Sequence, residues 1–189
     1  MTRRAPIAGA VAVAAVALTW GLFVVLPKRA ARPAANPAEA APTAAASSGR
    51  KIKARLFYVA EDGTHLTHVE RDIAYGEGTL EQAREIMAAQ LAPVADPLVS
   101  AIPAGTTLRA LFLTERGQAY VDFSREIITA HSGGTIDELL TVYTVVNALT
   151  ENLPAVSGVQ LLVGGKEVDT LAGHVDLRNP LAKNLAWVQ

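Results

Sequence analysis

The chain has 189 residues, half of them hydrophobic and 19% charged, and it contains no cysteine. This length fits one domain with accessory segments, and the lack of cysteine excludes disulfides, thiolate catalysis and lipid attachment through a cysteine. The residues from Arg50 onward carry a net charge of −5 against +4 before it, and an acidic main domain argues against nucleic-acid binding, which rests on clustered lysine and arginine.

The first segment of the chain is an uncharged stretch from Ala5 to Leu26. A helix over its apolar core, residues 7–26, would span the ~30 Å hydrocarbon core of a bilayer. We therefore predict an N-terminal transmembrane anchor over residues 1–26. A cleaved signal peptide is the alternative, but its apolar region is typically about 7–15 residues long and is followed directly by a small-residue cleavage site, whereas Pro27, Lys28 and Arg29 follow here.

A proline- and alanine-rich stretch over residues 27–50 is predicted to be a disordered, extended linker. Residues 51–178 are predicted to form the folded domain, and residues 179–189 a C-terminal tail. Basic residues flank both sides of the predicted anchor, with a small excess on the linker side. The positive-inside rule alone therefore does not place the domain outside the cytoplasm.

The folded domain opens with a predicted β-hairpin. Hydrophobic residues alternate with Lys51, Lys53 and Arg55 up to Tyr58, which is typical of a half-buried strand. Asp62-Gly63 is a tight-turn dipeptide, and a second strand is predicted from His65 to Ile73. On this alternation Leu56 is expected in the core.

A helix and two more strands follow. Thr79 and Gln82 fit a capping box for a helix that ends near Leu91, before the proline-containing loop 92–105. Strands are predicted over residues 106–114 and 118–123. On the first, Leu108, Ala110 and Phe112 share a face, so Phe112 is expected to be buried.

The last predicted elements are a long helix and a hairpin. Thr135 and Glu138 fit a second capping box, and the helix has a wide apolar stripe up to about Asn152. Strands are predicted over residues 159–163 and 166–168, joined at Gly164-Gly165, with a further short strand over residues 174–177. This order predicts an α+β fold with two helices packed on one mixed, mostly antiparallel sheet.

Several segments, taken in order and spacing, resemble the GerMN domain, a module first associated with sporulation and spore germination proteins. They are residues 55–63, 69–73, 101–113, 118–126, 139–154 and 159–168. The resemblance covers about residues 50–177 as a single copy, where the family can carry a tandem pair. It implies an α/β domain on the outer face of the cytoplasmic membrane, in the periplasm or an equivalent space, with its N-terminus inside.

The residue pattern holds no catalytic constellation, cofactor motif or metal site. His65 and His68 would point to opposite faces of a strand, and His131 and His174 are isolated. Asp122 and Ser124 have no base placed by the sequence and are expected to cap a turn. An enzyme would become the better interpretation if a cleft collected two or more of five residues: Asp122, Glu126, His131, Asp137 and His174.

These observations predict a non-catalytic, membrane-anchored module that interacts with envelope proteins or with itself. The alternative is an accessory protein that binds or hydrolyses peptidoglycan. The candidate interaction surface consists of Lys53 and Arg55 on the first strand, with Tyr143 and Asn147 on the second helix.

Overall fold

The structure is a computed structural model that describes residues 49–189. The predicted anchor, residues 1–26, and nearly all of the predicted linker lie outside this range. Within residues 49–189 no helix has the length and apolar character needed to cross a bilayer.

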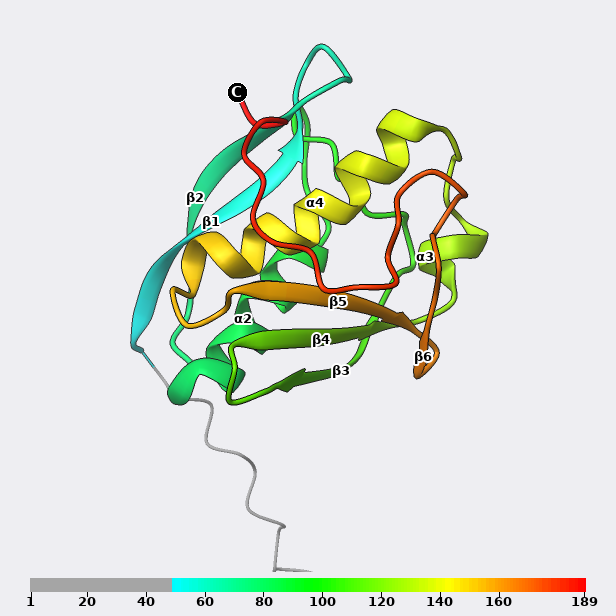
Figure 1. The fold of residues 1–189 in the computed structure, drawn as a ribbon. Coiled ribbons are helices and arrows are strands. Elements are labelled where there is room, and N and C mark those ends of the chain that lie inside the picture. Colours follow the sequence, from blue (N-terminus) through cyan, green and yellow to red (C-terminus); the bar gives the residue numbers. More distant parts are fainter. Residues whose placement is uncertain (1–48) are drawn as a thin grey trace, which may run out of the picture. The chain divides into compact units, whose positions relative to one another are not determined.

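The described residues form two β-sheets with helices between them (Figure 1). In chain order the elements are β1 (Lys51–Val59), β2 (Leu66–Ala74), α2 (Gly78–Leu91), β3 (Leu108–Leu113), β4 (Gln118–Phe123), α3 (Glu126–Thr129), α4 (Thr135–Asn152), β5 (Gly158–Val163) and β6 (Lys166–Glu167). This order confirms the mixed α+β class.

The prediction of a single sheet is wrong. Strands β1 and β2 form a separate antiparallel hairpin, and the other four strands form a sheet in the order β3-β4-β5-β6, with β4 and β5 parallel. Helices α2 and α4 pack against each other and contact strands of both sheets. Each helix therefore buries apolar surface against both sheets. The helices hold the hairpin in place, and it does not pair with the larger sheet.

The hairpin follows the predicted alternation. Ala54, Leu56 and Tyr58 are buried on one face of β1, whereas Lys53 on the other face is exposed. Phe57 lies on the same side as Lys53 but is also fully buried, so this part of β1 is covered on both faces. The turn at Gly63 has a φ of 69°, a left-handed conformation that glycine adopts without steric cost.

The prediction that Phe112 is buried is wrong: its side chain is 58% exposed, and Leu111 is buried instead. The register between β3 and β4 shifts between Leu108 and Ala110, which is a β-bulge at Arg109. An extra residue reverses the alternation. Leu108 and Leu111 therefore both face the core, opposite Phe123 and Val121.

Neither predicted capping box forms, because in the described structure both long helices begin without a side-chain cap. Helix α2 begins at Gly78, one residue before Thr79. The Gln82 amide oxygen instead accepts the Gly76 N–H at 3.0 Å. Helix α4 begins after Gly134, and the Glu138 side chain turns inward rather than back to the helix start.

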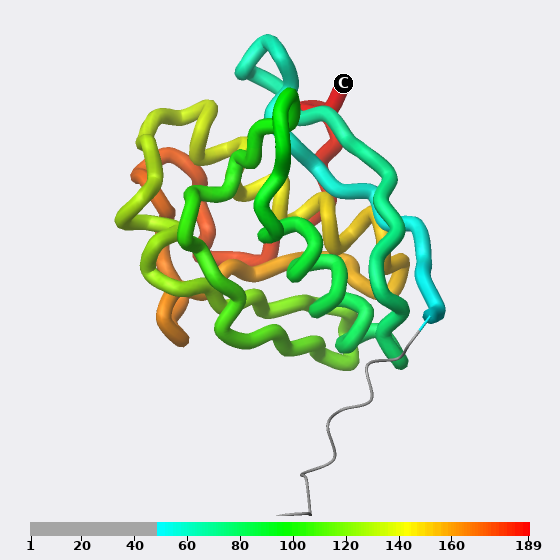
Figure 2. Tube along the Cα trace, turned by 180° about the vertical axis from the view of Figure 1, so that it is seen from behind, coloured from blue at the N-terminus to red at the C-terminus, as the bar shows by residue number. Residues whose placement is uncertain are grey.

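The residues after β6 are irregular but fixed to the domain. The predicted strand over residues 174–177 is absent there, and that segment is a loop. Further on, Leu181 exchanges backbone hydrogen bonds with Val159 on β5, and Leu66 on β2 bonds to Trp187 and Gln189. Figure 2 shows this return of the C-terminal residues to the hairpin from behind.

Candidate functional site

Asp122 and Ser124, at the end of β4, hold neighbouring turns. Asp122 accepts the Gly165 N–H at 2.8 Å and an Arg109 guanidinium N–H at 3.1 Å. The Ser124 hydroxyl accepts the Thr107 N–H at 3.0 Å. These bonds agree with the expected turn-capping role. They leave Asp122, which is almost fully buried, without a free oxygen directed at solvent.

His131 bonds through both ring nitrogens. Its Nδ1 accepts the Gly133 N–H at 2.9 Å, and its Nε2 lies 3.1 Å from the Thr141 hydroxyl. An accepting Nδ1 assigns the ring proton to Nε2, which then donates to Thr141. This histidine therefore positions the loop between α3 and α4.

Glu138, which the sequence predicts to be part of a helix cap, is a fully buried carboxylate. It accepts the backbone N–H groups of Leu171, Ala172 and His174 at 2.7–2.9 Å, and the His174 Nδ1 lies 3.2 Å away. Burial alone would raise the pKa of this carboxyl, but the backbone hydrogen bonds together outweigh it, so its pKa lies below the ordinary value. Its position four and seven residues before buried Val142 and Val145 is the sequence signal for its burial.

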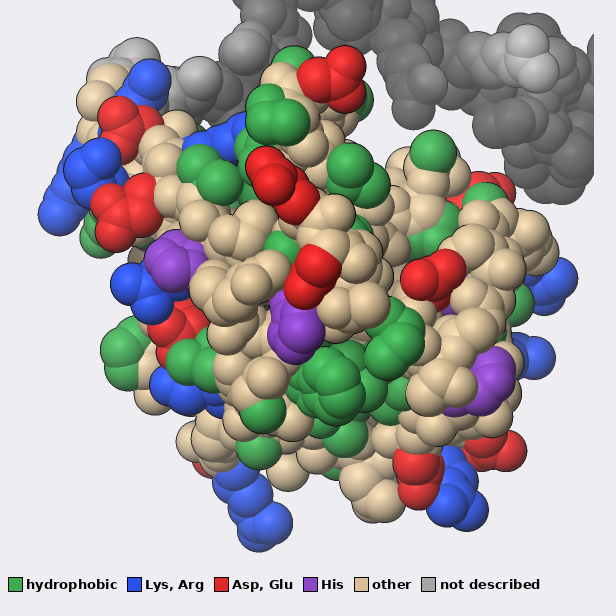
Figure 3. Space-filling view, turned by 90° about the horizontal axis from the view of Figure 1, so that it is seen from above, with side chains coloured by type: hydrophobic (Ala, Val, Ile, Leu, Met, Phe, Trp, Pro, Cys, Tyr) green, Lys and Arg blue, Asp and Glu red, His purple; other side chains and the backbone are tan. Residues whose placement is uncertain are grey.

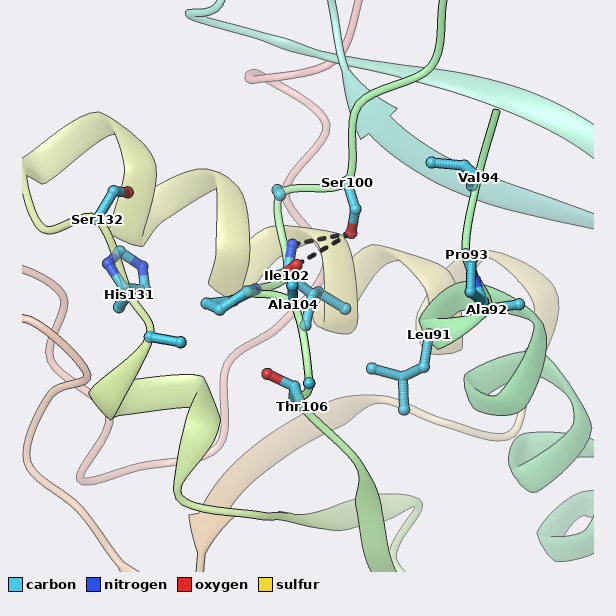
Figure 4. A pocket seen from close by; sticks show the side chains of 14 residues that line it. Leu91, Ala92, Pro93, Val94, Ser100, Ile102, Ala104, Thr106, His131 and Ser132 are labelled. Atoms are coloured by element: carbon cyan, nitrogen blue, oxygen red, sulfur yellow. Dashed lines mark hydrogen bonds between the residues drawn. The ribbon is translucent and has the colours of Figure 1, made fainter. Parts of the chain in front are cut away.

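A pocket of about 420 Å³ lies between the end of α2, the loop of residues 100–106 and the residues after α3 (Figure 4). Its walls are mostly small apolar residues, and the Ser100 hydroxyl within it bonds to the backbone of Ile102. Of the five residues whose convergence would indicate an enzyme, this pocket contains only His131. The buried Thr106 hydroxyl on its wall has no hydrogen-bond partner among the described residues.

The two other histidines lie apart from this pocket. His65 lies in the β1–β2 turn with its Nδ1 2.7 Å from an Asp62 oxygen, and the His68 ring lies 6.3 Å from that of Phe57. The Thr64 N–H, followed by the His65 ring, lowers the pKa of Asp62 to about 2. Within residues 49–189, no three His, Asp or Glu side chains come close enough to hold a metal ion.

Lys53 and Arg55 lie next to each other on one face of the hairpin, among ion pairs. The Lys53 ammonium is 3.7 Å from Asp72, and the Arg55 guanidinium is 2.8 Å from Glu151 at the end of α4. Lys183 contacts the same carboxylate at 2.8 Å and is the main cause of its lowered pKa. Figure 3 shows basic and acidic side chains interleaved on the side of the molecule that the hairpin forms, at left.

The structure does not bring Asn147 to this surface. Asn147 is fully buried, and its amide exchanges two hydrogen bonds with the backbone of Asn184 at 2.8 and 3.1 Å. Tyr143 is half-buried and packs against the core. Of the four candidate residues, Lys53 is exposed and Arg55 is half-buried, and only these two lie together on one face of the hairpin.

Residues 55–169 match the model of one protein family, described as Germane, sporulation and spore germination. A comparison with curated proteins returns no significant match. Among solved structures, a protein from Clostridium perfringens described as a candidate lipoprotein is 20% identical, with a TM-score of 0.51 over 70% of this chain and 88% of that one. The tandem GerMN domains of the sporulation protein GerM from Bacillus subtilis are 19% identical, with a TM-score of 0.55 over 70% of this chain and 46% of the tandem. At these identities the likeness is one of fold.

Proposed function

Because the chain belongs to the Germane family of sporulation and spore germination domains and carries a single GerMN-like domain, we propose that it is a non-catalytic module for interaction within the cell envelope. An N-terminal membrane anchor, residues 1–26, holds the module in the cytoplasmic membrane. A linker, residues 27–50, connects it to the domain, residues 51–178, which lies outside the cytoplasm. The segment 179–189 follows the domain in the chain.

The observation that carries the non-catalytic part of this proposal is the set of partners of the titratable side chains. Asp122 bonds to a turn and an arginine, His131 to a loop and a hydroxyl, and Glu138 to three backbone N–H groups. General acid–base or nucleophilic catalysis needs such groups directed at a substrate-sized space. These three are committed to positioning backbone instead.

The location can be tested by adding protease to intact spheroplasts that produce the full chain. Digestion of the domain outside the membrane, together with a protein that retains its first residues, is the expected result. A protected domain would contradict the topology. A mature protein that lacks the first few dozen residues would contradict the anchor and favour a cleaved signal peptide.

The interaction can be tested by photo-crosslinking in cells, with a photoreactive amino acid in place of exposed Lys51 on the hairpin. Lys53→Ala combined with Arg55→Ala should leave folding intact, because the exposed Lys53–Asp72 pair contributes only about 0–1 kcal/mol and Glu151 keeps its contact with Lys183 when Arg55 is removed. The double substitution should nevertheless reduce the crosslinked species. Lys166→Ala, at the exposed start of β6, is the matched control. Equal crosslinking by the unsubstituted protein, the double variant and Lys166→Ala would contradict the proposed surface. Crosslinks only to cell-wall polymer would favour the peptidoglycan-binding alternative.

A further inference from the structure

The hairpin has two long edges, and the edge on the β1 side is occupied over the second half of the strand, from Arg55 to Val59. In an antiparallel pair, alternate residues direct their N–H and C=O groups away from the partner strand. On β1, the Asn152 amide exchanges two hydrogen bonds with the backbone of Arg55, and the Gln90 amide does the same for Phe57, all at 2.7–2.9 Å. The Val59 N–H bonds to Val99 at 2.8 Å.

The edge on the β2 side is occupied only at its two ends. Leu66 donates to the carbonyl of Trp187 and accepts the N–H of Gln189 at 2.7 and 2.9 Å. At the other end, the Gln82 amide donates to the carbonyl of Ala74 at 3.3 Å. The residues between them that point the same way are His68, Glu70 and Asp72. All three are exposed, and no other group in the described part of the chain bonds to their outward N–H and C=O.

We propose that this open edge, the outward backbone of His68, Glu70 and Asp72, binds one extended strand of a partner protein that places lysine or arginine beside Glu70 and Asp72. The inference rests on the proposed function and extends its surface from Lys53 and Arg55 on β1 to the open edge of β2, with the chemistry of the strand that binds there. Strand addition supplies a main-chain hydrogen bond for each open group. The added strand continues a pairing that already exists, because Val188 forms a parallel bridge with Leu66.

The charges of the open edge select a basic strand. In the hairpin register Arg55 lies opposite Glu70, but the Arg55 guanidinium is directed to Glu151. Glu70 forms no ion pair with the rest of the described chain. Asp72 has only the long contact to Lys53, in which both side chains are exposed. A cation on a neighbouring strand would therefore gain a favourable cross-strand pair at both positions.

The same charges oppose a second copy of the chain as the occupant. Antiparallel pairing of two open edges about a twofold axis at Glu70 places the two Glu70 carboxylates opposite each other. A twofold axis at Arg71 pairs Glu70 with Asp72 twice, so both registers set like charges in contact. An axis at Val69 would bring Asp72 against Leu66, where residues 187–189 already lie.

A fused probe strand tests the open edge in the full chain. In this probe, five residues are added after Gln189, with lysine at the first, third and fifth added positions and threonine at the second and fourth. Continuing the bridge between Leu66 and Val188 places these lysines beside His68, Glu70 and Asp72. Hydrogen–deuterium exchange in detergent micelles should then slow by about tenfold or more at the amides of these three residues.

Two control probes test the pairing and the charge separately. Prolines at the second and fourth added positions remove the N–H groups needed for pairing and should abolish the protection. Glutamates in place of the lysines should weaken it.

Protection that is equal for the proline and threonine probes, or equal for the lysine and glutamate probes, would overturn the inference. No protection by any probe would also overturn it. Concentration-dependent protection of residues 68–72 without a probe would identify a second copy as the occupant, against the proposal.

In cells, the lysine–threonine probe should reduce the crosslinks formed from position 51, whereas the proline probe should not. Crosslinks that form equally with both probes would show that the partner binds elsewhere, which overturns the inference and leaves the proposed function standing. If no crosslinks form with any protein, the proposed function fails, and the exchange measurement still decides whether the edge accepts a basic strand.

Discussion

The carboxylate of Glu138 accepts the backbone N–H of His174 at 2.7 Å, across 36 positions of the chain. The other carboxylate oxygen accepts the N–H groups of Leu171 and Ala172. One side chain in the first turns of α4 therefore holds a loop that has no regular secondary structure of its own. A buried carboxylate is tolerated here because backbone donors replace the water it has lost.

Replacing this carboxylate by an amide should destabilise the fold. Glu138→Gln keeps the shape of the side chain but turns one oxygen into an NH₂ group, which faces N–H donors. We expect the free energy of unfolding in urea at pH 7 to fall by about 2–3 kcal/mol, since buried donors lose a charged acceptor. Glu115→Gln on the exposed β3–β4 turn should change it by less than about 0.5 kcal/mol. Equal effects of the two substitutions would contradict a structural role for Glu138.

The same residue predicts a pH dependence of stability. The pKa of Glu138 is lower in the folded protein than its ordinary value of 4.5, so its stabilising contribution is complete above pH 4.5 and is lost as the pH falls through the folded pKa. Urea unfolding between pH 7 and pH 3 should therefore show a steeper acid loss for the wild type than for Glu138→Gln. Other carboxylates titrate in both proteins and therefore affect both curves alike. Parallel curves of stability against pH would contradict a contribution from Glu138.

Truncation should destabilise the protein much more at Leu56 than at Phe112, although the alternation in the sequence predicts that both are buried. Leu56 has no exposed surface, and Leu56→Ala should lower the free energy of unfolding by about 2–5 kcal/mol. Phe112 is 58% exposed, so Phe112→Ala should cost about 1 kcal/mol or less. Chemical unfolding of the two variants decides this, and a larger loss for Phe112→Ala would contradict the bulge at Arg109.

Local patterns were sufficient to predict the strands of the hairpin and the long helix α4. The alternation from Lys51 to Tyr58 and the wide apolar stripe of α4 depend on short-range periodicity, which the sequence contains in full. Short-range periodicity does not predict the bulge at Arg109, because the pairing with the opposite strand, β4, defines it. The division into two sheets was also missed, since either strand pairing satisfies the same hydrophobic pattern.

The candidate surface was predictable only where exposure follows from alternation, as for Lys53 and Arg55. Asn147 is a polar helical residue, and the sequence does not distinguish a solvated amide from a buried one. Its partner is the backbone of Asn184, 37 positions away. For the same reason the sequence does not reveal the roles of Gln90 and Asn152. Their side-chain amides bind the outward backbone groups of β1 through contacts that are distant in the chain.

Two glycines with similar backbone angles should differ in their tolerance of a side chain. Gly63 and Gly117 have φ values of 69° and 78°, which disfavour any side chain. At Gly63 an added Cβ meets nothing within 4 Å, so Gly63→Ala should cost about 1–2 kcal/mol from the left-handed backbone alone. At Gly117 the Cβ would lie 2.5 Å from the carbonyl oxygen of Ala155, and the clash should add about 1–3 kcal/mol. Thermal unfolding should rank Gly117→Ala as clearly less stable, and the opposite ranking would contradict the packing of this turn.

The amides that close the β1 edge give a final matched pair, because Gln90 is fully buried whereas Asn152 is half-buried. Gln90→Leu leaves the N–H and C=O of Phe57 unpaired where water does not reach, so we expect a loss of about 2–4 kcal/mol in the free energy of unfolding. Asn152→Leu leaves the backbone of Arg55 nearer to solvent, where hydration compensates, and should cost about 1 kcal/mol. Hydrogen exchange at the Phe57 amide should accelerate only in the Gln90 variant. Losses of equal size in the two variants would mean that water already reaches the edge at Phe57, and that burial does not set the strength of the pairing.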